Sequence, residues 1–130
     1  MQPALQHFNL TLAWLWILLG FLSGLGLGMK FQEENWLGGY SSLRRRMYRL
    51  AHISFFGLGA VNLLFHLSRE SLGTGRGVDI ASVLFALGAI SMPVCCVLMA
   101  HFPRSQNLFA VPVLSLTAGG LLIIIQLFAS

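Results

Sequence analysis

Charge is the property that this chain most lacks. Only 9% of its 130 residues are charged, whereas 56% are hydrophobic and the mean hydropathy is +0.77. Soluble domains carry about 25% charged residues, so this chain has too few polar groups to cover a water-soluble globule. We therefore expect one integral membrane domain that spans residues 1–130.

Acidic residues and cysteines are both scarce. The four carboxylates all fall in predicted loops or at the ends of apolar runs: Glu33, Glu34, Glu70 and Asp79. No apolar run therefore holds an acid for a proton relay, and no nucleophile has an evident base beside it. The two cysteines, Cys95 and Cys96, are adjacent, so their side chains point apart and form neither a disulfide framework nor a C-x-x-C metal site. We expect a non-catalytic protein without a metal site.

The net charge of +4 comes from basic residues that cluster at the ends of apolar runs. Nucleic-acid binding proteins typically interleave basic residues with exposed aromatic ones, whereas basic residues beside a membrane span meet anionic lipid. The predicted partners are membrane lipid and other membrane subunits or a second copy of this chain, not nucleic acid.

Four apolar runs are each long enough to cross a bilayer, which takes about 20 helical residues. The predicted spans cover about residues 8–29, 47–68, 80–102 and 108–129. Short connections make neighbouring helices antiparallel, so the expected fold is all-α, a four-transmembrane-helix antiparallel bundle. Ser41 or Ser42 is expected to cap the second helix and Asp79 the third, and Pro93 is expected to interrupt the third.

The basic residues also predict which way the bundle faces. The connections after spans one and three hold six of them, whereas the opposite side holds Arg69 and Arg76 only. The richer side is expected in the cytoplasm. The Arg44–Arg46 loop is therefore predicted to be cytoplasmic and both termini non-cytoplasmic, in a bacterial inner membrane. The six residues are Lys30, Arg44, Arg45, Arg46, Arg49 and Arg104.

Small residues recur on two of the spans. In the first span Gly20, Gly24 and Gly28 are spaced four apart, and the fourth span contains Gly119 and Gly120. Such positions let helix backbones approach closely in lipid. They are expected either to pack inside the bundle or to form the face that docks a partner subunit.

The histidines sort into two pairs by depth. His52 and His66 lie fourteen residues apart in the second span, which places them about 40° apart around a helix. His101 lies at the depth of His52, and His7 at the depth of His66. Two imidazoles at one depth suit a haem iron with two axial histidines.

The run from Arg49-x-x-His52 through Gly57 and Gly59 to His66-x-x-Arg69 resembles the haem-bearing helix of cytochrome b, the membrane subunit of quinol:cytochrome c oxidoreductases. The resemblance covers residues 49–69. It implies b-type haem ligated by His52 and His66, with Arg49 and Arg69 near the propionates, and it makes His101 and His7 candidates for the remaining ligands. In that family a second helix carries a similar histidine pair, and no other span here does.

Simpler roles for the histidines stay open. A histidine near a helix end commonly lies among lipid headgroups and hydrogen bonds to water, lipid or a backbone carbonyl. A metal or quinone site is a third interpretation of the histidines, beside this one and haem.

Two functional hypotheses follow. The first, which the sequence favours, is an accessory or structural subunit of a larger membrane complex, of the respiratory type, that docks through its glycine faces. The second is a haem-binding electron-transfer subunit.

Cysteine labelling in intact cells tests the predicted orientation. In a background without the native cysteines, we expect Ser41→Cys to react with a membrane-impermeant maleimide only after the cells are permeabilised. Thr74→Cys, in the loop on the other side, is expected to react without permeabilisation, because the basic residues hold the first loop in the cytoplasm. The reverse pattern would contradict the orientation.

Overall fold

The computed structural model describes residues 7–130, and within them all regular structure is helical. Four of its helices are long and apolar enough to cross a membrane. This confirms the predicted all-helical class and the number of spans. In chain order the elements are α2 (Phe8–Lys30), η1 (Trp36–Gly38), α3 (Leu43–Leu72), α4 (Arg76–His101), η2 (Pro103–Phe109) and α5 (Ala110–Ala129).

Helix ends differ from the predicted spans mainly around α3. This helix continues to Leu72, so Arg69 lies in its last turns and not in a loop. Ser42 caps its start by accepting a hydrogen bond of 3.2 Å from the backbone N–H of Arg45, which confirms one of the two predicted caps. The prediction that Asp79 caps α4 is wrong. Gly75 takes that position, and the Asp79 carboxylate lies 3.6 Å from the Arg69 guanidinium.

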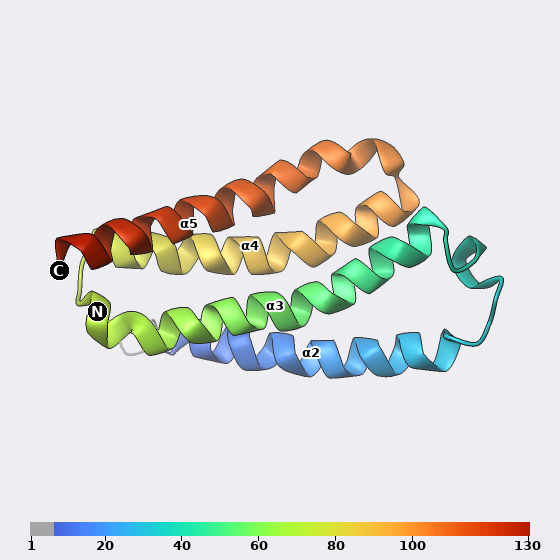
Figure 1. The fold of residues 1–130 in the computed structure, drawn as a ribbon, viewed down its shortest axis with the longest axis horizontal. Coiled ribbons are helices and arrows are strands. Elements are labelled where there is room, and N and C mark those ends of the chain that lie inside the picture. Colours follow the sequence, from blue (N-terminus) through green and yellow to red (C-terminus); the bar gives the residue numbers. More distant parts are fainter. Residues whose placement is uncertain (1–6) are drawn as a thin grey trace.

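Helices that are consecutive in the chain lie side by side (Figure 1), and most contacts between elements join such neighbours. In Figure 1 the α2–α3 and α4–α5 connections lie at one end of the bundle, and the α3–α4 turn lies at the other end with the C-terminus. In the most apolar stretch of α4, 44% of the residues are buried, against 17% in α2. Helices α3 and α4 therefore form the middle of the bundle, and α2 and α5 flank them.

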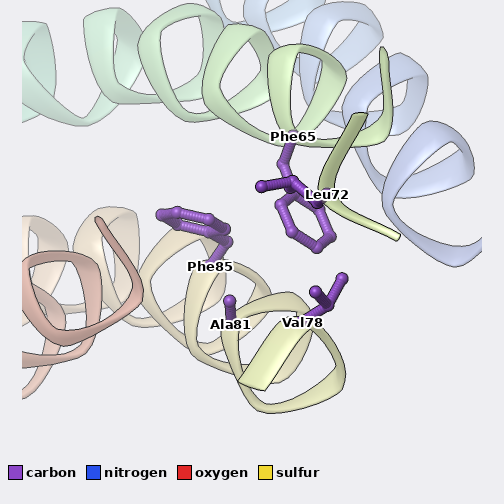
Figure 2. Close-up of a cluster of buried hydrophobic side chains, with 5 residues drawn as sticks. All are labelled: Phe65, Leu72, Val78, Ala81 and Phe85. Carbon is purple, nitrogen blue, oxygen red and sulfur yellow. The ribbon is translucent and has the colours of Figure 1, made fainter. Parts of the chain in front are cut away.

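A cluster of buried apolar side chains joins α3 and α4 beside their connecting turn. Figure 2 shows the side chains that meet there: Phe65 and Leu72 from α3, and Val78, Ala81 and Phe85 from α4. The rings of Phe65 and Phe85 lie 5.3 Å apart between centroids. This packing holds the end of α3 against the start of α4, which is where Arg69 meets Asp79.

A hydrogen-bonded cluster of polar side chains, Asn9, Asn62 and Ser82, joins α2, α3 and α4 in the interior. Both asparagines are fully buried. Asn9 donates to Oδ1 of Asn62 at 2.8 Å and accepts from the Ser82 hydroxyl, while Asn62 donates to the Leu58 carbonyl at 2.9 Å. Burying an amide costs free energy unless it is hydrogen bonded, so these three residues stabilise only the arrangement in which they meet.

Pro93 creates a second polar contact between helices. It has no N–H, so the Ala89 carbonyl one turn earlier loses its partner within α4. The Trp16 indole of α2 donates a hydrogen bond of 2.9 Å to that carbonyl. Neighbouring helices often satisfy the groups that proline frees inside a membrane.

Replacing this indole tests the contact. We expect Trp16→Phe to lower the free energy of unfolding in detergent by about 1 kcal/mol, because it leaves the Ala89 carbonyl unpaired. Trp14→Phe is the matched control, since Trp14 is 62% exposed. In a Pro93→Ala background the restored N–H pairs with the carbonyl, and Trp16→Phe should cost less. An equal cost in both backgrounds would contradict this account.

Candidate functional site

Two histidines from different helices come together at the end of the bundle that carries the α3–α4 turn. His7 immediately precedes α2, and His66 lies in the second half of α3. Their ring centroids are 6.1 Å apart, with 43° between the ring planes. The chain brings them together through the polar cluster, because Asn9 lies two residues after His7 and Asn62 one turn before His66.

A cavity of about 590 Å³ opens beside the two imidazoles. Its volume lies within the range of small-molecule and cofactor sites, about 300–1,000 Å³. Gly73 ends α3 with a φ of 72°, a left-handed conformation that favours glycine and turns the chain away along the cavity wall. The lining residues are His7, His66, Leu67, Arg69, Glu70, Gly73 and Thr74.

Arg69 brings positive charge to this cavity. Its side chain is only 12% exposed, and its guanidinium carbon lies 5.6 Å from the centroid of the Phe65 ring. The Asp79 carboxylate at 3.6 Å offsets part of the charge, and Glu70 lines the same cavity. The cavity therefore offers charged groups of both signs beside two imidazoles.

His66 also carries an unusual buried atom. Its Nδ1 is buried and has no hydrogen-bond partner within residues 7–130, and no other side-chain nitrogen or oxygen there shares this condition. Leaving a buried polar group unpaired costs about 1–3 kcal/mol. Nearly all such groups in proteins are satisfied by the chain, by water or by a ligand. His66 is therefore the residue whose surroundings point most directly to a bound group.

His52 has a different environment from His66, although both are on α3. The His52 Nδ1 and the Ser23 hydroxyl of α2 are hydrogen bonded at 2.8 Å. The ring also meets Phe56 edge-on at 5.5 Å. A Cβ atom at Gly24 would lie 2.8 Å from His52 Cε1, so α2 and α3 are in close contact here. His52 is held within a packed helix contact.

His101, a predicted ligand, and Arg49, predicted to lie near a propionate, are toward the other end of the bundle. His101 is exposed, and its Nε2 is hydrogen bonded to the Tyr48 hydroxyl at 2.8 Å. The Arg49 guanidinium stacks on the Tyr40 ring at 4.4 Å. The structure thus brings His7 and His66 together, whereas His52 and His101 each bind a different hydroxyl group.

The predicted glycine faces divide between inside and outside. Gly20 and Gly24 receive Phe56 and His52 of α3, and Gly119 receives Phe85 of α4. A Cβ at Gly28 or Gly120 would meet nothing within 4 Å. Gly20, Gly24 and Gly119 therefore allow helices of this chain to pack closely. Gly28 and Gly120 are open to a neighbouring protein.

The described residues contain no group of three or more histidine, cysteine or acidic side chains that could hold a metal ion. Comparison of the chain with protein-family models, curated proteins and solved structures finds no match. The function is therefore inferred from the geometry around His7 and His66.

Sequence reasoning did not single out Asn9, Ser82 or the Trp16 contact. A signal for the last is present in the sequence, since a proline inside a span always frees the carbonyl four residues earlier. Which helix supplies the donor depends on packing that only the folded chain shows.

Proposed function

We propose that this protein is a small integral membrane subunit, without catalysis of its own, that holds a b-type haem through His7 and His66 and serves electron transfer in a larger membrane assembly. Four apolar helices support the membrane location. The observation that carries the haem proposal is the pairing of the two imidazoles beside a cofactor-sized cavity.

The pair fits what a haem requires of a protein. Two imidazoles that hold one haem iron would both have to lie close to it, and therefore near one another. The centroids of His7 and His66 are separated by 6.1 Å. A porphyrin supplies the other metal ligands itself, so two histidines are sufficient. A lone metal ion would need further protein ligands, and the described residues offer no third one.

Other residues of the cavity match the rest of the cofactor. Arg69 is positioned to neutralise a propionate, as the resemblance to cytochrome b implies. The buried Nδ1 of His66 has no hydrogen-bond partner among the described residues. The bound group would supply one-electron redox chemistry, and the chain would hold and orient it. His52, which the resemblance also implied as a ligand, is instead assigned a packing role.

The proposal includes an orientation. With antiparallel spans across the bilayer, both termini outside and the Arg44–Arg46 loop in the cytoplasm, His7 and His66 would lie near the outer surface of a bacterial inner membrane. A haem placed there would exchange electrons with a partner on that side.

Absorption spectroscopy tests the haem proposal. The reduced-minus-oxidised spectrum of the purified protein should show a b-type band, and His7→Ala and His66→Ala should each abolish most of it, because each removes one of the two imidazoles that would hold the haem. His52→Ala and His101→Ala are the matched controls and should keep the band, because both residues bind hydroxyl groups elsewhere.

Two results would overturn the haem proposal. One is a featureless spectrum from folded protein that has been supplied with haem. The other is a band that disappears in His52→Ala and persists in His66→Ala, because His66 would then not hold the haem.

A second candidate function is a purely structural accessory subunit without a cofactor. The observation that favours it is the open backbone at Gly26 and Gly28 on α2, where a Cβ would meet nothing within 4 Å. A helix of another subunit could approach closely there.

Two leucine variants of α2 test this docking face. Gly28→Leu should release co-purifying membrane subunits in mild detergent at unchanged stability, because it adds bulk only on the outside. Gly24→Leu should instead destabilise the chain itself by more than about 2 kcal/mol, because its side chain overlaps His52. If Gly28→Leu retains every partner, or if the wild-type protein purifies alone, the docking role is contradicted.

A further inference from the structure

A second cavity, of about 310 Å³, lies at the opposite end of the bundle from His7 and His66. It is formed where the start of α3 meets the end of α4 and the following turn. One basic side chain, one histidine and several apolar residues share its wall. The lining residues are Leu37, Gly38, Ser42, Leu43, Arg44, Ala100, His101 and Pro103.

Arg44 is the guanidinium that faces this cavity without a partner among the described residues, and it is exposed. Its neighbours in the triple-arginine run behave differently. Arg45 is buried and donates to the carbonyls of Phe31 at 2.7 Å and Glu33 at 3.0 Å, so it fastens the first loop to α3. Arg46 is exposed and does not line the cavity.

His101 adds a second polar group to the cavity lining. Its Nε2 is hydrogen bonded to Tyr48, and its Nδ1 has no partner in the part of the chain that the structure describes. Basic residues dominate the surroundings, because this end of the bundle holds six of them against the two acids Glu33 and Glu34. The six are Lys30, Arg44, Arg45, Arg46, Arg49 and Arg104. Lys30 and Glu33 already pair at 3.0 Å, so the excess positive charge remains.

From this placement we infer that the cavity binds the phosphate headgroup of an anionic phospholipid, with Arg44 and His101 as its polar contacts. Guanidinium groups match phosphate oxygens well. The cavity lies at the ends of membrane-spanning helices, which is the depth of lipid headgroups. Apolar residues, among them Leu43 and Pro103, line the same space, so they suit the glycerol and the first acyl carbons better than a free phosphate ion. The inference is independent of the haem proposal.

Lipid titration of the purified, delipidated protein tests this site. Native mass spectrometry should show phosphatidylglycerol binding more tightly than phosphatidylcholine. Arg44→Gln should weaken phosphatidylglycerol binding about tenfold, since it removes the one unpaired guanidinium from the cavity. Arg46→Gln removes the same charge two residues farther along α3, outside the cavity lining, and should change binding less than about twofold. Arg44→Lys should restore part of the loss.

Each alternative outcome rejects the site. Equal losses in Arg44→Gln and Arg46→Gln would show diffuse attraction between a basic surface and anionic lipid. Equal binding of the two lipids would show that only the acyl chains are held. Full displacement of phosphatidylglycerol by millimolar inorganic phosphate would assign the cavity to a soluble anion. Unchanged helical circular dichroism and melting temperature in both glutamine variants confirm that each comparison concerns a folded protein.

Discussion

The buried hydrogen bonds among Asn9, Asn62 and Ser82 are the constraint on which the arrangement of the helices depends. In lipid, apolar side chains gain little by meeting one another instead of acyl chains, so packing and polar contacts decide which faces of the helices meet. Both asparagines are fully buried, and sliding any of the three helices would separate an amide from its partner. The same constraint aligns the start of α2 with the end of α3, and His7 with His66 as a consequence.

The Trp16–Ala89 hydrogen bond extends this logic to the middle of the bundle. Pro93 weakens α4 by one internal hydrogen bond, and α2 restores it from outside, so the defect in one helix becomes a specific contact for another. The polar cluster of Asn9, Asn62 and Ser82 and the Trp16 indole both join α2 to α4, although these helices share few other contacts. Helix α2 is thus held mainly by α3 through packing and is tied to α4 at two hydrogen-bonded points.

Much of the architecture could be predicted from the sequence, because long uncharged runs have few alternatives. The number of spans and a serine cap at Ser41 or Ser42 follow from local residues, and the structure shows that Ser42 is the cap. The end of α3 could not be predicted in this way, because Arg69 and Glu70 resemble loop residues in the sequence. The structure shows that Arg69 pairs with Asp79 across the turn. The division of the glycines also depended on partners, because only the fold shows that Gly24 faces His52 and that Gly28 faces outward. Histidine spacing placed His52 and His66 on one side of α3, but not in the same environment.

The two ends of the bundle differ in what they do with polar side chains. Toward the α2–α3 connection most of them satisfy the chain itself, with Arg45 binding loop carbonyls, Arg49 stacking on Tyr40 and His101 binding Tyr48. At the other end His66 is held beside His7, and its buried Nδ1 has no hydrogen-bond partner among the described residues. A fold that pairs its buried amides so completely would lose stability by leaving one imidazole nitrogen without a partner, unless something outside the described chain binds there. That contrast within one molecule favours the cavity beside His66 as the functional site.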